Sequence, residues 1–427
     1  MLKPMVEKII WLYILLLPLQ TVFIFDEKFI NGAKWHYGTG VFYATEILLV
    51  VAVFLSLIQL IKSERLALSE FFTKNNILKK ATIVCLWLLA FWSGLSILWS
   101  AEKSAAFYLW LKLLEGMALF LIILSLKINK NKLLWPLSFT AGLQGLLAGW
   151  QFVTQSITEN KWLGIATHEA GRLGEIVIEN SDGRWLRAYG TFAHPNILGG
   201  FCVFGLLATL ELSRLAKKQH RIILMVVAMA NALGIFFSFS RSAWLATIIA
   251  MAIVIIRSIK EKDCKSMKAF VSASLVGVFL LFAFSSFVVT RSDLSNRLEQ
   301  KSLDERGSQI MESLGIFRSS NWLGVGINNY TATLASLYPD LPAYSLQPAH
   351  NLYLLILSEL GVFGFLFFLL FIILFFIQEG ICHKKIIWLA PLLIIGLFDH
   401  YLWTQYVGIV LFWLVLTFFY KSCKIVR

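Results

Sequence analysis

Residues 352–378 have the sequence LYLLILSELGVFGFLFFLLFIILFFIQ, in which Ser358 and Glu359 are the only strongly polar side chains before Gln378. A helix needs about 20 mostly apolar residues to cross a bilayer. Continuous apolar sequence favours a helix, because a membrane-barrel strand alternates apolar and polar residues. This stretch exceeds one crossing, so we expect its helix to begin outside the membrane, with Gly361 and Gly364 near the point where it enters.

Further apolar runs show the same continuous pattern, and the composition agrees with them. The chain of 427 residues is 58% hydrophobic and 15% charged, whereas soluble domains carry about 25% charged residues. The other runs are 9–25, 41–61, 81–100, 105–126, 133–153, 197–213, 222–239, 243–257, 268–290, 386–402 and 405–420. The sequence therefore predicts an all-α integral membrane protein, a single polytopic domain over residues 1–427 with about twelve transmembrane helices.

The distribution of Lys and Arg predicts the orientation of these helices. The formal net charge is +13, and most of the 38 Lys and Arg residues fall in alternate loops between the apolar runs. Because the cytoplasmic loops of membrane proteins carry the positive excess, we expect a multi-pass protein of the bacterial inner membrane with both termini in the cytoplasm. The positive charge then reflects topology and contact with membrane lipids, and we expect no binding of nucleic acid.

Two loops on the predicted periplasmic side are long, namely 154–196 and 291–351, and the second includes a helical stretch. Catalytic and binding groups tend to lie on loops held by a rigid scaffold. The long loops therefore favour an enzyme over the alternative, a transporter or flippase. The five cysteines show no spacing typical of a zinc site, and we expect neither a metal nor another cofactor.

The first candidate site joins the loop 154–196 to the apolar run that follows it. Arg187 precedes Gly190-Thr191-Phe192-Ala193-His194-Pro195-Asn196, and Pro195 suits the first turn of a helix. Exposed amides at that helix start, with Arg187 nearby, could bind an anion. The alternative interpretation is a turn followed by a helix start, with His194 as a capping or packing residue.

Arg241 lies between the runs 222–239 and 243–257, at the outer tip of a predicted tight helical hairpin. A cation at this position opposes the positive-inside bias. Its guanidinium group either extends to lipid headgroups or pairs with an anion, and its planar fork of donors suits phosphate.

The second long loop contains a further arginine and a pair of glycines. Asp304-Glu305-Arg306-Gly307 precedes a helical stretch at 308–317, and Gly324 and Gly326 follow. The glycines indicate a tight turn with close backbone approach, but their short pattern lacks the context of a nucleotide-binding motif. Arg306 alone would be read as a solvated surface charge.

His350-Asn351 opens the run 352–378 at the outer face. Histidine is a common general base because its ordinary pKa of about 6.5 lies near working pH. A capping or interfacial histidine is the alternative. Arg187, Arg241, Arg306 and His350 all map to one side of the membrane, so together they indicate a site for a phosphate-bearing substrate.

Other polar groups receive lesser roles. Asp26 and Glu27 abut a helix end and mark a membrane boundary, with metal binding as the alternative. Lys112 and Glu115, three residues apart on one helix, are expected to pair with each other. Contacts between packed helices are expected for Glu46, Asp399 and His400, with positions in a cavity as the alternative.

Taken together, these residues resemble the O-antigen ligase and O-antigen polymerase superfamily. The resemblance covers most of the chain and is densest over a core at about 187–364. The matching positions are Arg187 with Gly190 to Asn196, Ser240-Arg241, Arg306 followed by Gly324 and Gly326, and His350-Asn351 followed by Glu359-Leu360-Gly361. Two positions depart from the family pattern: Ile310 stands where Trp is frequent, and Asn321-Trp322 stand where Pro is frequent.

The resemblance implies a metal-independent, inverting glycosyltransferase with a GT-C-like fold. Its donor would be an undecaprenyl-diphosphate-linked glycan, such as O-antigen or a similar surface polysaccharide. Its acceptor would be a hydroxyl of the lipid A–core for a ligase, or of another lipid-linked glycan for a polymerase. Fixed arginines would stabilise the charge that develops on the departing diphosphate, and a positioned base would remove the acceptor proton.

On this basis His350 is expected to be the catalytic base, and Arg241, Arg306 and Arg187 to bind the diphosphate. Supporting or loop-shaping roles are expected for His194, Asn196, Asn351, Gly324 and Gly326. We favour a ligase, with a polymerase of the same superfamily as the alternative. Two further alternatives are a glycosyltransferase that uses a polyprenyl-phosphate sugar and depends on Asp26 and Glu27, and a polysaccharide transporter.

Overall fold

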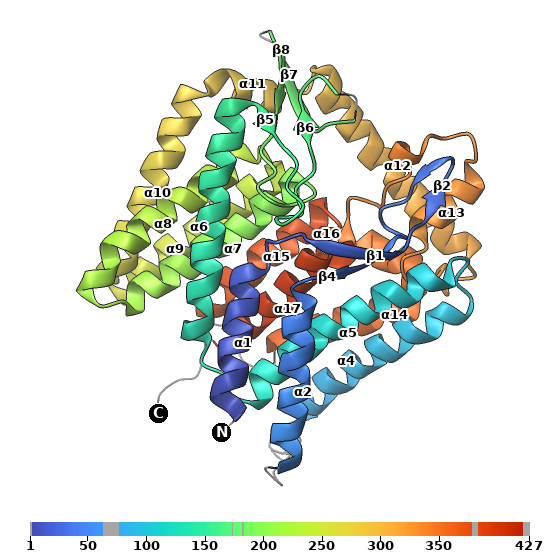
Figure 1. Ribbon diagram of the computed structural model, residues 1–427, viewed down its shortest axis with the longest axis horizontal. Helices are drawn as coiled ribbons and strands as arrows, with labels where there is room; N and C mark the ends of the chain where they lie inside the picture. The colour runs from blue at the N-terminus through green and yellow to red at the C-terminus, as the bar shows by residue number, and fades with distance from the viewer. Residues whose placement is uncertain (1, 63–76, 173, 182, 378–382, 422–427) are drawn as a thin grey trace.

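The computed structural model describes residues 2–62, 77–172, 174–181, 183–377 and 383–421, most of them helical (Figure 1). Each predicted apolar run contains a helix. These helices are α1 (Leu2–Leu16), α2 (Glu46–Lys62), α4 (Ile77–Leu95), α5 (Lys103–Ser125), α6 (Lys130–Thr154), α7 (Pro195–Leu215), α8 (Arg221–Phe237), α9 (Arg241–Glu261), α10 (Cys264–Ala283), α14 (Leu352–Ile377), α15 (His383–Phe398) and α17 (Tyr406–Lys421).

Within the described ranges, seven helical spans are long and apolar enough to cross a membrane, and three shorter helices are apolar. The all-α membrane class is therefore confirmed. The number of crossings and the GT-C-like arrangement stay predictions, as does the placing of the termini.

The first apolar run is only partly helical. We expected a helix over 9–25, but α1 ends at Leu16 and residues Val22–Asp26 form strand β1. Pro18 accounts for the end of the helix, because proline disfavours helical backbone in the residue before it and lacks an N–H. β1 pairs in antiparallel register with β4 (Gly40–Tyr43), which occupies the start of the next predicted run.

Three further antiparallel hairpins join this one, so the chain is not purely helical. They are β2–β3 (Phe29–Ile30 with Ala33–Lys34), β5–β6 (Ser156–Ile157 with His168–Glu169) and β7–β8 (Val177–Asn180 with Gly183–Leu186). All three lie in segments that the sequence assigns to outer loops. Figure 1 shows β5–β8 at the end of the molecule away from the start of α1, with β1 and β4 nearer its middle and β2 beside α13.

The late loop 291–351 is mostly ordered into short elements. It contains the end of α11 (Ser285–Ser292), α12 (Arg297–Ser319), α13 (Tyr330–Leu337) and the 3-10 turn η3 (Ala343–Ser345). Asn296 caps α12, because its side-chain oxygen accepts a hydrogen bond from the Leu298 N–H at 3.1 Å. The predicted helical stretch 308–317 is the second half of α12.

The prediction of a tight helical hairpin at Arg241 is right about the short connection and wrong about the packing of the two helices. The connection is short, since α8 ends at Phe237 and α9 begins at Arg241. However, α9 packs chiefly on α15, and α8 packs on α6, α7 and α10. Phe239 adopts a left-handed φ of 45°, and the turn around it directs the two helices apart.

Helix α14 is broken at Gly361, whose φ of 64° and ψ of −165° are not helical. The loop after α12 fills the break. The N–H of Gly326 donates to the carbonyl of Glu359 at 2.8 Å, and the N–H of Val362 donates to the carbonyl of Trp322 at 3.0 Å. A glycine is required here because only glycine enters this backbone region without strain.

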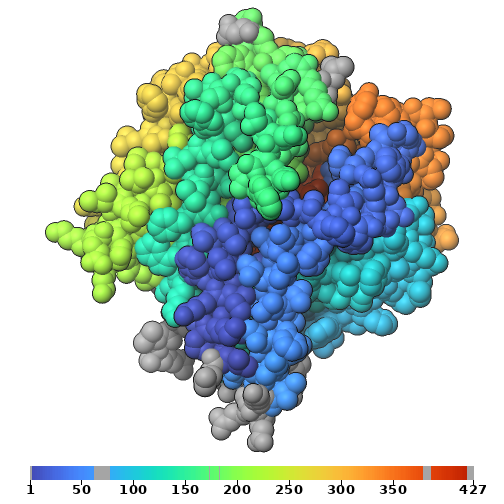
Figure 2. All heavy atoms as spheres, viewed as in Figure 1, coloured from blue at the N-terminus to red at the C-terminus, as the bar shows by residue number. Residues whose placement is uncertain are grey.

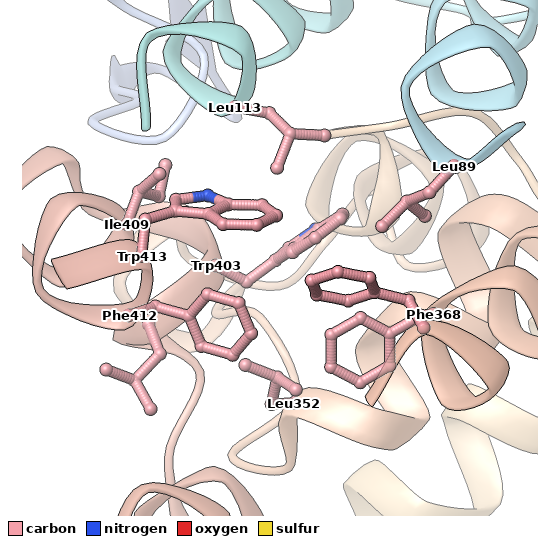
Figure 3. A pocket seen from close by; sticks show the side chains of 10 residues that line it. Leu89, Leu113, Leu352, Phe368, Trp403, Ile409, Phe412 and Trp413 are labelled. Atoms are coloured by element: carbon pink, nitrogen blue, oxygen red, sulfur yellow. The ribbon is translucent and has the colours of Figure 1, made fainter. Parts of the chain in front are cut away.

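Aromatic side chains fill the core where α4, α5, α14 and α17 meet the short helix α16 (Tyr401–Thr404). Figure 3 shows Trp403, Trp413, Phe368 and Phe412 gathered there with leucines from the neighbouring helices. The gap between them is about 10 Å³, on the order of one water molecule. This cluster is packed core, and it fixes the position of residues 399–405 beside the outer loops.

Candidate functional site

A cavity of about 720 Å³ opens between the hairpins and the late loop. Segments distant in sequence line it, and they lie within 20–43, 164–175, 192–197, 343–350 and 399–405. In Figure 2 the corresponding recess lies between the blue N-terminal hairpins, the green loop and the orange helices, with the red C-terminal part at its floor. Five of the seven histidines of the chain line this cavity, namely His36, His168, His194, His350 and His400.

Gln309 on α12 holds His350 in one orientation. The backbone N–H of His350 donates to Gln309 Oε1 at 2.9 Å, and His350 Nδ1 lies 3.2 Å from the same oxygen. Because an amide oxygen only accepts hydrogen bonds, Nδ1 must carry the proton. The lone pair of Nε2 is then free, and this is the tautomer that a general base requires.

Burial lowers the pKa of His350 below its ordinary value. The carboxylate of Asp399 acts against this shift, and the guanidinium of Arg306 adds to it. Desolvation disfavours the charged imidazolium, so the ring is neutral at pH 7. His350 therefore has the protonation state, the tautomer and the position at a cavity wall that proton abstraction needs.

Asp399 and His400 line the cavity, as the alternative interpretation predicts, rather than forming only the helix-packing contacts that we favoured. They fall at the end of the predicted run 386–402, but α15 ends at Phe398 and leaves both on the connection to α16. The two rings of His350 and His400 meet edge to face with centroids 5.2 Å apart. Burial raises the pKa of Asp399, while His350 and other polar neighbours lower it.

Asn196 links Asp399 to Arg187. Its Nδ2 donates to Asp399 Oδ2 at 2.6 Å, and its Oδ1 accepts from Arg187 Nη2 at 2.7 Å. Arg187 Nε also donates to the carbonyl of Ser238 at 2.7 Å, and the residue is 4% exposed. This geometry ties the first long loop to α7, α8 and the C-terminal segment.

His194 caps α7, as the helix-start interpretation predicts. Its Nδ1 accepts the N–H of Asn196 at 3.0 Å, and its ring lines the cavity. Burial, with Arg187 nearby, holds the pKa of His194 well below its usual value, so the ring is neutral and acts as an acceptor.

A group of arginines lies beside the cavity and surrounds the carboxylate of Glu299 on α12. Glu299 forms ion pairs with Arg291 and, at 3.0 Å, with Arg241. Arg241 also donates to the hydroxyl of Ser302 at 3.4 Å. Sequence reasoning missed Arg291 and Glu299, because charged residues at the edge of a polar loop resemble an ordinary solvated surface.

Arg306 lies close enough to feel the charges of Asp399 at the cavity and of Arg291 and Glu299 in the arginine group, since all three influence its pKa. Burial is the largest influence and lowers that pKa. The guanidinium group of Arg306 forms no hydrogen bond or ion pair with another residue in the part of the chain that the structure describes. A half-buried cation without such a partner is available to an incoming anion.

The glycines of the late loop serve backbone packing. Gly324 and Gly326 have φ values of 80° and 98°. A Cβ at Gly326 would lie 1.9 Å from the hydroxyl of Ser100, and one at Gly324 would lie 2.4 Å from the carbonyl oxygen of Glu359. The close approach expected from the sequence is therefore present, and it joins the loop to α14 and to the end of α4.

Asn351 fixes the start of α14. Its Oδ1 accepts the N–H groups of Tyr353 and Leu354, both at 3.0 Å. Its Nδ2 donates to the carbonyl of Leu397 at 3.1 Å, near the end of α15. Asn351 therefore sets where the helix behind His350 begins.

The other acidic side chains that the sequence analysis named form ion pairs with nearby lysines. Lys112 pairs with Glu115 at 3.3 Å, which confirms the expected pair, and it also binds the buried carboxylate of Glu46. Asp26 lies 3.8 Å from Lys28, and Glu27 lies 2.6 Å from Lys34.

A comparison with known families finds a match that includes α9, α12 and the start of α14. Residues 224–369 match the family model described as O-antigen ligase. This segment is similar to the O-antigen ligase family. The O-antigen ligase segment contains Arg241, Arg306 and His350, whereas Arg187 and Asn196 precede it. Among curated proteins no match was found.

The match confirms the resemblance to the O-antigen ligase and polymerase superfamily. Together with the apolar helices, the match indicates a multi-pass bacterial membrane protein and, in general terms, an enzyme of the glycosyltransferase type. The O-antigen ligase family implies, in general terms, a lipid-linked glycan as donor and a glycan as acceptor.

Proposed function

We propose that the protein transfers a glycan from undecaprenyl diphosphate to an acceptor hydroxyl at the periplasmic face of the inner membrane, as a metal-independent ligase. The observation that carries the proposal is the position of His350. It lines a cavity and has a free Nε2 lone pair, while Arg306 and the arginines around Glu299 lie beside it.

In the proposed reaction the acceptor oxygen attacks the anomeric carbon of the donor sugar. The bond between that carbon and the diphosphate oxygen breaks, and the electron pair leaves with undecaprenyl diphosphate. His350 Nε2 takes the proton of the acceptor hydroxyl. Attack opposite the leaving group inverts the anomeric centre, and Arg306 and Arg241 stabilise the charge that develops on the diphosphate, with Arg187 holding the loop behind them.

The scaffold belongs to the same proposal. About twelve helices would cross the membrane in a GT-C-like arrangement, with both termini in the cytoplasm and the loops 154–196 and 291–351 in the periplasm. Labelling of single cysteines placed near His350 and Arg306 with a membrane-impermeant reagent tests this. Labelling only from the cytoplasmic side would contradict the proposed orientation.

Transfer is tested with the purified full-length protein in detergent. Undecaprenyl-diphosphate-linked oligosaccharide is incubated with lipid A–core, or with a second lipid-linked oligosaccharide, and products are identified by mass spectrometry. Product on lipid A–core supports a ligase, and chain extension of the lipid-linked glycan supports a polymerase. Equal turnover with and without EDTA supports independence from metal.

The transfer assay, together with a transport measurement in vesicles, separates two other functions. Dependence on metal, with loss of transfer in Asp26→Asn, would favour a glycosyltransferase that uses polyprenyl-phosphate sugars. Transport of lipid-linked glycan across a vesicle membrane without any transfer would favour a polysaccharide transporter.

A further inference from the structure

The cavity and the arginine group differ in charge. The charged groups that line the cavity are Lys34, Arg172, Glu175 and Asp399, so cations and carboxylates are balanced. Glu175 is paired with His168 at 2.7 Å. By contrast, none of the arginines at 187, 241, 291 and 306 lines the cavity. A diphosphate therefore finds its complementary charge beside the cavity and not inside it.

The cavity wall instead offers flat side chains with polar edges. Histidines and tyrosines predominate among its ionisable residues, and Trp35 joins them. Tyr37 meets the ring of His400 edge to face with centroids 5.6 Å apart. Such groups combine an apolar face with donors and acceptors at the rim. This combination suits an uncharged polyhydroxy compound, whose rings have apolar faces and hydroxyl edges.

His350 lies at the boundary between the two regions. It lines the cavity, while Gln309 holds its Nδ1 side and the charge of Arg306 acts on it. A general base must be within hydrogen-bond reach of the proton that it removes. The hydroxyl that loses its proton to His350 must therefore come from a molecule in the cavity.

We infer that the cavity is the subsite for the acceptor glycan, and that the donor diphosphate binds on the arginine side of His350. This inference rests on the proposed function and adds to it a division of the site between the two substrates. The 720 Å³ cavity lies within the range of small-molecule sites, about 300–1,000 Å³. The sugar that carries the attacking hydroxyl occupies the part nearest His350, and the adjoining sugars extend toward Tyr344 and His36.

Tyr344 and His36 provide the test because both line the cavity and are exposed, Tyr344 to 71%. Their replacement therefore leaves the packed core unchanged. Tyr338 is the matched control, because it is 43% exposed near the same loop and does not line the cavity. The variants are Tyr344→Ala, His36→Ala and Tyr338→Ala in the full-length protein.

Binding is measured without turnover, with two kinds of probe. The sugar probes are phosphate-free oligosaccharides prepared from the lipid A–core and from the lipid-linked glycan, and the anion probe is undecaprenyl diphosphate. We expect Tyr344→Ala and His36→Ala each to weaken binding of one sugar probe by about fivefold, the effect of one lost planar contact. Binding of undecaprenyl diphosphate should not change, and Tyr338→Ala should bind both probes like the wild type.

The inference is overturned if the cavity variants weaken the binding of undecaprenyl diphosphate and leave sugar binding intact. It is also overturned if neither sugar probe binds the wild-type protein. If the wild-type protein binds the sugar probes but transfers no glycan, the proposed function is contradicted and the sugar subsite remains. The two failures are therefore distinguishable.

Discussion

Gln309 Oε1 lies within hydrogen-bond distance of two nitrogens of one residue, the backbone N and the Nδ1 of His350, at 2.9 and 3.2 Å. The helix α12 thereby controls which nitrogen of the imidazole carries the proton. A merely structural contact would need only the backbone hydrogen bond. The second contact gives Gln309 a role in the proton chemistry of the proposed transfer.

Replacement of Gln309 is expected to change the pH dependence of transfer. In Gln309→Glu a carboxylate accepts a hydrogen bond from Nδ1–H and stabilises the imidazolium, so the pKa of His350 rises and the acid limb of the kcat profile moves to higher pH. In Gln309→Leu the tautomer is no longer fixed, and kcat should fall by about tenfold with little change in KM for the donor. An acid limb that stays in place in Gln309→Glu would show that the contact does not act on His350.

The wild-type enzyme should remain active in mildly acidic solution. Burial lowers the pKa of His350 from its ordinary value, and the base works in its neutral form. Transfer should therefore be lost only as pH falls below about 6.5, and it should be level around pH 7. A kcat profile whose acid limb lies above the ordinary histidine pKa would contradict this sign.

His350→Ala should reduce kcat by about 10²–10⁴-fold, the usual contribution of a general base. His220→Ala is the control, because His220 lies in the 3-10 turn before α8 and does not line the cavity. Near wild-type turnover in a correctly folded His350→Ala protein would exclude His350 as the base.

Replacement of Arg306 should reduce catalysis, whereas replacement of Arg187 should reduce the stability of the fold. The guanidinium group of Arg306 has no hydrogen-bonded partner among the described residues, so Arg306→Ala should lower kcat by about 10²–10³-fold with an unchanged Tm. Arg187 is buried and bonded to Asn196 and Ser238. Arg187→Ala should cost about 1–3 kcal/mol of stability by leaving these acceptors unsatisfied. Thermal unfolding in detergent and turnover, measured on both variants, test the separation.

Glu299→Gln should strengthen the binding of undecaprenyl diphosphate. The carboxylate of Glu299 pairs with Arg241 and Arg291, and so it competes with an incoming diphosphate for the same cations. The amide keeps the shape and removes the charge, so the Kd should fall several-fold, and more at low salt because charge attraction is then less screened. Titration at two salt concentrations measures the effect. Weaker binding in Glu299→Gln would show that the carboxylate orients the arginines for the ligand.

Continuous apolar runs made the helical class predictable. Arg241 could be singled out because a cation on the outer side of the membrane opposes the positive-inside bias. The strand at Val22–Asp26 was not predicted, because an apolar run in lipid and an apolar edge strand have similar composition. A place in the cavity was not favoured for Asp399, because the residue lies near the end of the apolar run 386–402. Only the end of α15 at Phe398 places it in the cavity.

Gln309 and Glu299 could not be found from the sequence at all. Both lie on α12, a polar helix in which such residues are normally solvated. Their partners, His350 and Arg241, are far away along the chain, so the pairs exist only after α12 has folded onto α14 and the start of α9. The candidate bases and cations were visible in the sequence, and the residues that orient or neutralise them were not.

The break at Gly361 has a consequence for the lipid around the protein. Beyond it, the apolar part of α14 runs from Val362 to Ile377, and Gln378 and Glu379 follow in the sequence. At 1.5 Å per residue this part is about 24 Å long, shorter than a hydrocarbon layer of about 30 Å. A bilayer adapts to such a mismatch by thinning locally. The headgroup level beside α14 is then drawn inward toward Val362, which leaves the turns of α14 between Leu352 and Leu360, and His350 before them, outside the hydrocarbon layer.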